Sequence, residues 1–215
     1  MRFIPVYEPI FLGNEKKYLC QAIDSGWVSS EGYFVKKFEE EFAKWSGNKY
    51  AVAVCNGTAA LETAIWSLGI KNKTIAIPDY SIISGALAIL RTKNTLQFYD
   101  KPSGFVSNYL LRYHVFGDWC SDEAETIIDD ASQYPKPFYV KDVACYSLYA
   151  NKIITSGEGG IILTNKKEVY ERARSYRNLC HSEERFVHNE LGYNFRMSNL
   201  QGAVALAQLE QIDKF

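Results

Sequence analysis

The sequence lacks the features that define several large classes of protein. It has no apolar run of membrane-spanning length and no block of lysine and arginine, and its formal net charge is only −1. These absences argue against a membrane-spanning protein and against nucleic acid as the main partner. The N-terminal run also has no apolar signal core, so we expect a soluble, cytoplasmic protein.

Cysteine pairing is a second absence. The five cysteines form no CxxC pair and lie far apart, so we expect neither a zinc site nor a disulfide framework. What the chain does have is apolar residues, at 47%, including 15 tyrosines and 12 phenylalanines. A chain of 215 residues with this composition can form a sizeable core, in one large domain or two small ones.

Strand-like and helix-like runs alternate along the chain. Amphipathic or capped runs predict helices over about 14–24, 34–45, 59–68, 81–91, 166–178 and 199–213. Short apolar runs predict strands over about 50–54, 74–78, 96–99, 113–116, 126–129, 144–149, 152–155 and 160–164. This alternation is typical of βαβ units and predicts an α/β fold with a mostly parallel sheet.

A glycine-containing turn joins the first predicted strand to a helix through Asn56, Gly57 and Thr58. The free N–H groups of a first helical turn and the helix dipole both favour a phosphate at such a place. An ordinary helix cap is the alternative interpretation of the same residues.

An acidic pair, Asp129 and Asp130, follows the strand predicted over 126–129. Ligands bind at the carboxyl ends of parallel strands, and a carboxylate there can pair with the protonated ring nitrogen of a pyridine cofactor. A pair of helix-capping aspartates is the alternative.

A single lysine, Lys152, stands between an apolar run and a glycine-rich turn. Burial disfavours the ammonium form, so such a lysine can act as a Schiff-base nucleophile, although most lysines in this setting only bury their stems at the edge of a core. Ser147 precedes it by five residues. The order of phosphate turn, strand-end aspartate, serine and lysine predicts pyridoxal phosphate bound in an α/β domain.

In this order of motifs the chain resembles the DegT-type sugar-nucleotide aminotransferases, which use pyridoxal phosphate on the aspartate aminotransferase fold. The likeness runs from residues 4–9 to 206–213, and the run 13–30 looks most like perosamine synthases. It implies a three-layer α/β/α large domain of fold type I over residues 1–215, with some connections trimmed. It also implies that the C-terminal small domain of the family is missing.

The resemblance implies a role for each matching residue. Lys152 should bind the cofactor and shuttle protons, Asp130 should pair with the pyridine nitrogen, and Gln133 should lie against the ring or its hydroxyl. The phosphate should be held by Gly57, Thr58, Ala59 and Ser147, and by Asn194 from the neighbouring subunit of a homodimer. The residues expected near the substrate are His188, Trp27, Ser29 and Glu158. Ile82 stands where the family often has an aromatic residue over the cofactor ring.

The implied reaction moves an amino group from glutamate to a nucleotide-linked 4-keto-6-deoxy sugar of the perosamine type, for amino-sugar and surface-glycan synthesis. Another hypothesis is a weakly active remnant that binds pyridoxal phosphate and serves as a dimerising or regulatory partner. A related dehydratase is a third, but those relatives have histidine at the position of the lysine, so Lys152 argues against it.

Overall fold

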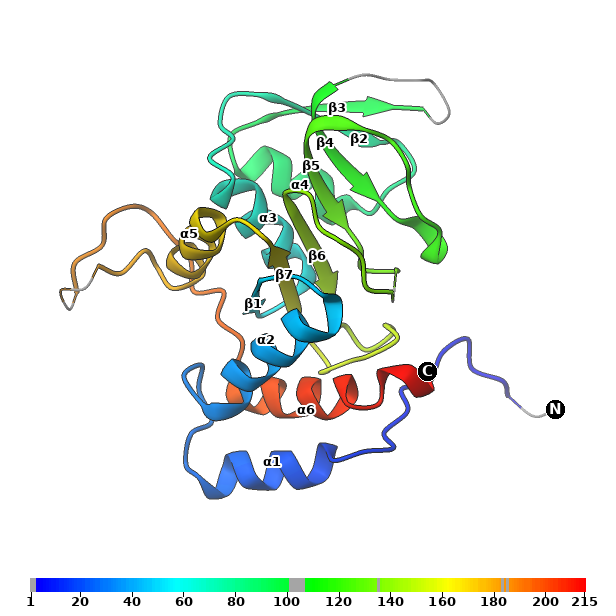
Figure 1. The fold of residues 1–215 in the computed structure, drawn as a ribbon, viewed down its shortest axis with the longest axis vertical. Coiled ribbons are helices and arrows are strands. Elements are labelled where there is room, and N and C mark those ends of the chain that lie inside the picture. The colour runs from blue at the N-terminus through cyan, green and yellow to red at the C-terminus, as the bar shows by residue number, and fades with distance from the viewer. Residues whose placement is uncertain (1–2, 101–106, 135, 183, 185) are drawn as a thin grey trace.

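The computed structural model describes residues 3–100, 107–134, 136–182, 184 and 186–215, and in this part strands and helices alternate up to β3, after which β3 to β7 follow without an α-helix between them (Figure 1). The strands are β1 (Tyr50–Val54), β2 (Thr74–Pro78), β3 (Thr95–Tyr99), β4 (Ser107–Tyr113), β5 (Ala124–Asp130), β6 (Val143–Ser147) and β7 (Gly160–Thr164). They form one seven-stranded sheet in the order β1-β7-β6-β5-β4-β2-β3. Only β7 runs antiparallel to its neighbours, so the carboxyl ends of the remaining strands lie at one edge.

Helices cover both faces of this sheet. They are α1 (Glu15–Asp24), α2 (Tyr33–Ser46), α3 (Gly57–Ser67), α4 (Ile83–Arg91), α5 (Lys167–Arg177) and α6 (Asn199–Leu209), with short 3-10 turns η1 (Val115–Gly117) and η2 (Ile212–Lys214). The helices α3, α4 and α5 lie on one face, whereas α2 lies on the other with α6 and then α1 beyond it (Figure 1). No helix in the described ranges is long and apolar enough to cross a membrane.

Two apolar clusters hold these layers together. On one side, Phe38 and Phe42 of α2 pack with strand residues such as Ile161. On the other side, the buried face of α3, which includes Leu61 and Ile65, packs against β1, β5, β6 and β7. The expected α/β fold with a mostly parallel mixed sheet is therefore confirmed.

Two of the predicted strands are wrong. The run 113–116 is not a strand, because β4 ends at Tyr113 and the chain turns into η1, where Phe116 has a φ of 53°. The run 152–155 is not a strand either, because the chain bends back on itself and Thr155 donates its hydroxyl hydrogen to the carbonyl oxygen of Leu148. Ile154 packs into the core on the α2 side, whereas Ile153 is exposed.

The parallel strands β4 and β5 are joined by residues 114–123 without an α-helix, an unusual connection. A buried carboxylate holds it together. Asp129 accepts hydrogen bonds from Arg112, with 2.6 Å to Nε and 3.1 Å to Nη2, and lies 3.0 Å from His114 Nε2. His114 Nδ1 accepts from the backbone N–H of Cys120, so its ring hydrogen sits on Nε2 and points to Asp129. Trp119 stacks on the His114 ring at 4.6 Å.

Replacing Asp129 tests how much this connection depends on the carboxylate. Asp129→Asn leaves the Arg112 guanidinium buried without its counter-ion, and we expect it to lower the free energy of unfolding by about 3–5 kcal/mol. Urea unfolding followed by circular dichroism measures the change. The matched control is Glu123→Gln, which removes only an exposed carboxylate 3.5 Å from the same guanidinium and should cost less than about 1 kcal/mol. Equal losses in the two variants would contradict this account.

Candidate functional site

A cavity of about 480 Å³ lies at the carboxyl ends of β5 and β6, beside the first turn of α3. Many of the residues singled out from the sequence line it, namely Gly57, Thr58, Asp130, Ser147, Lys152 and Glu158. They come from separate strands and loops that the topology brings to the same edge of the sheet. This position is where ligands bind in open α/β sheets.

The α3 end of the cavity is suited to an anion. The side chain of Asn56 accepts the N–H of Ala59 at 2.8 Å, so the first-turn N–H groups offered to an anion are those of Gly57 and Thr58. Gly57 has a steric reason to be glycine, because a Cβ atom there would lie 2.9 Å from the Cβ of Ser147. The glycine therefore lets the helix start approach the serine closely.

The floor of the cavity carries a buried carboxylate. Asp130 ends β5, and its Oδ1 accepts the backbone N–H of Ser132 at 3.0 Å. Burial raises the pKa of this carboxyl, while the hydrogen bond from Ser132 and the positive charge of Lys152 act in the opposite direction. A buried carboxylate needs a positive partner, and a protonated pyridine nitrogen is such a partner.

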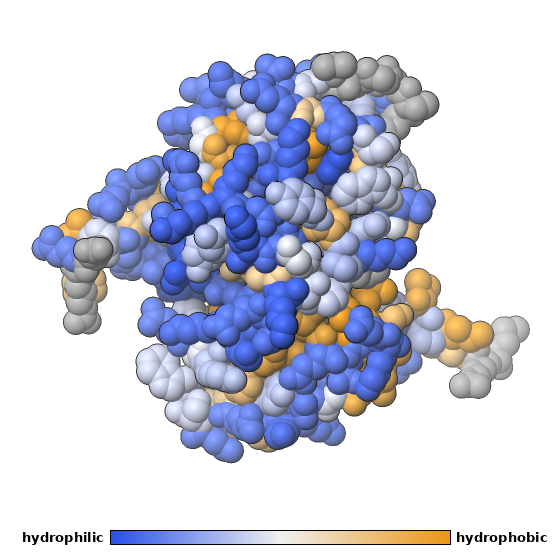
Figure 2. Space-filling model, in the orientation of Figure 1, coloured by the Kyte–Doolittle hydropathy of each residue, from blue (hydrophilic) through white to orange (hydrophobic). Residues whose placement is uncertain are grey.

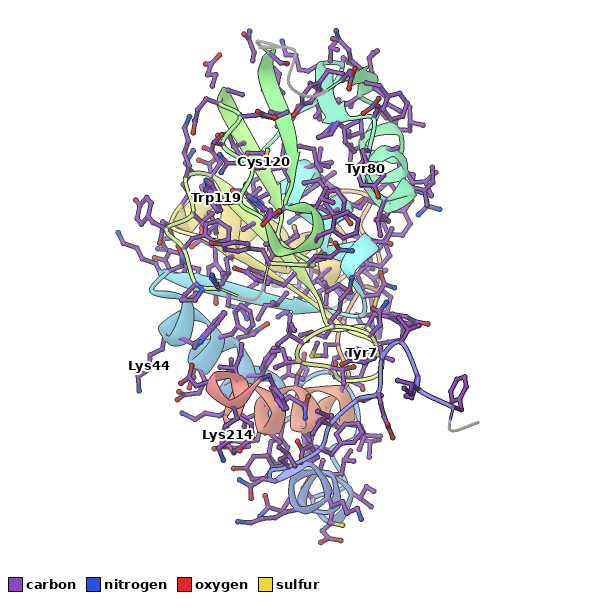
Figure 3. The ribbon with its side chains drawn as sticks, turned by 90° about the vertical axis from the view of Figure 1, so that its right-hand side faces the viewer. Tyr7, Lys44, Tyr80, Trp119, Cys120 and Lys214 are labelled. Carbon is purple, nitrogen blue, oxygen red and sulfur yellow. The ribbon has the colours of Figure 1, made fainter. Side chains whose placement is uncertain are left out.

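Lys152 lies in the loop after β6, and its side chain is half-buried at the cavity wall. Burial lowers the pKa of its amine, and the negative charge of Asp130 opposes this shift. Its carbonyl oxygen accepts a hydrogen bond from the hydroxyl of Tyr7, which lies beside this loop (Figure 3). An anion site, a buried acid and a nucleophilic amine in one cavity fit pyridoxal phosphate.

Two further predicted cofactor residues lie beside this cavity rather than on it. Ala59 is buried within α3, and its N–H is taken by Asn56. Gln133 lines a smaller neighbouring cavity that Lys152 also borders, and its Oε1 accepts the N–H of Phe116 at 2.8 Å. Ile82 lines the main cavity, at the position where the resemblance implies an aromatic residue.

The remaining predicted residues lie away from the cavity within a single chain. Asn194 is exposed and forms a β-bridge with Asn178. His188 is exposed, with Nδ1 2.8 Å from the carbonyl oxygen of Leu179. The side chains of Trp27 and Ser29 are exposed, and their carbonyl oxygens accept hydrogen bonds from Asn199. The roles expected for these four residues remain predictions.

Several cavity residues, Tyr113 among them, were not anticipated. Tyr113 ends β4 and lines the cavity close to Asp130. The expected strand 113–116 begins with this tyrosine, whereas the tyrosine stands at the carboxyl end of β4, where site residues gather. Locating β4 over Ser107–Tyr113 would have identified it as a site candidate.

Known proteins resemble this chain in sequence. The model of the DegT/DnrJ/EryC1/StrS aminotransferase family matches residues 11–104 and 139–215, which leaves out β4, β5 and their connection. A GDP-perosamine synthase of Escherichia coli O157:H7 is 34% identical over 100% of this chain and 68% of its own length. One from Vibrio cholerae is 32% identical over 98% of this chain and 66% of its own length.

Solved structures agree on the fold. Helicobacter pylori PseC, described as an aminotransferase involved in the biosynthesis of pseudoaminic acid, superposes with a TM-score of 0.89 at 20% identity. The match covers 99% of this chain and 67% of PseC. This chain therefore spans about two thirds of the length of the proteins that it matches.

The opposing effects on Lys152 can be separated by experiment. The Asp130 carboxylate favours the ammonium form, so Asp130→Asn should move the pKa of Lys152 further down. The pH dependence of Lys152 acetylation by acetic anhydride, followed by mass spectrometry in cofactor-free protein, reports that pKa. Asp24→Asn, at the exposed end of α1, is the control and should leave the midpoint in place. A midpoint that rises or stays in Asp130→Asn would refute the assigned interaction.

Proposed function

This chain belongs to the DegT/DnrJ/EryC1/StrS aminotransferase family, and we propose that it moves an amino group from glutamate to a nucleotide-linked 4-keto-6-deoxy sugar of the perosamine type. The observation that carries the proposal is the meeting of Asp130, Lys152 and the first turn of α3 at one cavity. The similarity to two GDP-perosamine synthases supports the choice of sugar. We place this reaction in amino-sugar and surface-glycan synthesis in the cytoplasm.

Different residues of the cavity would bind different parts of the family's cofactor, pyridoxal phosphate. Bound there, this cofactor supplies an electron sink that takes up an amino group and releases it to a carbonyl carbon. Gly57, Thr58 and Ser147 would hold its phosphate, and Asp130 would keep its ring nitrogen protonated. Lys152 would hold the cofactor through Nζ and move the proton at the reacting carbon, for which a readily neutralised amine is required.

The substrate side of the cavity is less enclosed. Glu158 is exposed at the cavity wall, within reach of solvent. We propose that it contacts the substrate there. Ile82 offers an aliphatic surface over the cofactor ring in place of an aromatic one, which would reduce the stacking contribution by roughly 0.5–1.5 kcal/mol.

We further propose a homodimer with shared active sites. The N-terminal segment is apolar and stands away from the body of the chain, with Phe3, Ile4 and Val6 exposed (Figure 2). A second copy of the chain would cover such side chains. In that assembly Asn194 would reach the cofactor phosphate of the partner. Trp27, Ser29 and His188 would line the substrate path from either copy.

The lysine assignment is tested by Lys152→Ala. Without the amine the cofactor is no longer held covalently, so the variant should lose the visible absorbance of bound pyridoxal phosphate after gel filtration. Turnover of GDP-4-keto-6-deoxymannose with glutamate should fall by about a thousandfold or more. Lys71→Ala, an exposed lysine before β2, is the control and should keep both signals. A wild-type chain that binds the cofactor but shows no turnover would favour the dimerising or regulatory hypothesis.

The shared site is tested by mixing two variants. If Asn194 acts across the interface, Lys152→Ala and Asn194→Ala subunits complement each other, because one site of the mixed dimer then has both residues. After the variants are unfolded and refolded together, activity should return to about a quarter of the wild-type value. The control is a chain that carries both substitutions, mixed with the Lys152→Ala chain. This mixture should restore no activity. Failure of the first mixture, with Asn194→Ala itself inactive, would place Asn194 in its own subunit's site.

A further inference from the structure

A second cavity, of about 290 Å³, lies at the carboxyl ends of β2 and β4. It borders the first one, since Tyr113 lines both. We call it the switch-point cavity, because the order of the strands reverses beside it. The next strand in the chain, β3, lies on one side of β2, and β4 lies on the other side of β2. Ligand sites in open α/β sheets form at such a reversal of strand order.

The segments that follow β2 and β4 leave the sheet on opposite faces. Gly85 of α4 packs close to Ile77 and Leu111, in the cluster on the α3 side. Trp119, in the connection after β4, packs on Tyr134 and Phe138, which belong with the cluster on the α2 side. The two segments therefore diverge, and a crevice opens between them.

Aromatic rings line this crevice and remain open to solvent. Tyr80 is 66% exposed, Phe116 is 76% exposed, and their ring centroids lie 6.0 Å apart. Trp119 is 45% exposed, although one of its faces covers the His114 ring (Figure 3). Exposed rings gathered at a ligand-binding edge offer stacking surfaces for another ring.

The polar groups of the cavity determine which kind of ligand ring it can bind. Its lining includes the carboxylates Asp79, Asp100 and Asp118, and no lysine or arginine among the described residues. Carboxylates repel a phosphate or diphosphate but accept hydrogen bonds from hydroxyl groups. The cavity therefore suits a neutral ring that carries hydroxyls and excludes a phosphorylated group.

The wall between the two cavities points to a ligand independently. Tyr113 as a residue is only 5% exposed, and its hydroxyl opens onto the cavities, where it has no hydrogen-bond partner within the described parts of the chain. Burial, with the nearby Asp130, raises the pKa of this hydroxyl to about 12, so it remains protonated and can donate. A hydroxyl-bearing ligand at this wall would accept its hydrogen.

We propose that the switch-point cavity binds the neutral, hydroxyl-bearing ring of the nucleotide sugar, with Tyr80 and Trp119 against its face and Tyr113 donating to one of its oxygens. This inference rests on the proposed function for the identity of the ligand. A nucleotide sugar contains two groups with a neutral, hydroxyl-bearing ring, the hexose and the nucleoside, so the test includes both. The diphosphate that joins the hexose to the nucleoside would lie outside the cavity, away from its three carboxylates.

The test uses cofactor-free protein, so that neither cofactor binding nor turnover enters the result. Methyl α-D-mannopyranoside and guanosine are titrated separately while tryptophan fluorescence is followed, and Trp119→Phe identifies the part of the signal that comes from Trp119. We expect at least one of the two to bind, with inorganic phosphate failing to compete. The ligand that binds shows which end of the nucleotide sugar the cavity takes.

Two variants and a control assign the binding to this cavity. Tyr80→Ala removes an exposed stacking ring and should weaken binding about two- to tenfold. Tyr113→Phe removes only the hydroxyl and should weaken it by a similar factor. Tyr139→Ala removes an equally exposed tyrosine outside both cavities and should change nothing. Absence of binding by both ligands, competition by phosphate, or equal effects of Tyr80→Ala and Tyr139→Ala would each overturn the proposal.

If the neutral ligands bind but the wild-type chain shows no cofactor absorbance and no turnover, the proposed reaction fails while the cavity assignment stands. If absorbance and turnover are present and neither ligand binds, only the cavity assignment fails. The two claims are therefore separable on the same protein preparation.

Discussion

The buried Asp129 carboxylate is the contact on which the site depends. It holds Arg112 and His114 at once and so ties β4 to β5, where the connection has no helix to pack across the strands. Side chains alternate across a strand, so fixing Asp129 on the α2 side fixes Asp130 on the opposite side. The same alternation places Tyr113 on the face opposite to Arg112 of β4 and to His114, which follows it. The ionic cluster on one face therefore positions the acid and the tyrosine of the cavity on the other.

Electrostatic complementarity then explains why one cavity can hold a charged cofactor. The first turn of α3 supplies N–H groups for an anion, and Asp130 supplies a negative charge for a protonated ring nitrogen. Lys152 lies with them at the same wall, with its pKa lowered by burial. Opposite ends of the cavity would thus attract opposite ends of pyridoxal phosphate and orient its ring.

The sequence was sufficient where local chemistry decides the structure. Strands β1 and β2 are continuous buried runs, and both were predicted with the bounds they have. The cavity residues at strand and helix ends, Lys152 and Asp130 among them, were found because they follow such runs. β4 was missed because its first half is polar and only its second half is buried. Tyr113 was missed with it, and Ile153 and Ile154 imitated a strand although tertiary contacts fold them into a loop.

The helix-free connection after β4 has two consequences that are physically linked. A crossover helix would bury the carboxyl-end rim of β2 and β4, whereas residues 114–123 cover the sheet with Trp119 and leave the rim open. A connection without a helix buries less apolar surface, and the buried Arg112–Asp129–His114 cluster stabilises it within the same segment. Residues 107–134, which lie outside the family match, therefore contribute to the open crevice and also keep the strands beside it in register. A helix inserted at this point would relieve the need for the cluster and would close the crevice at the same time.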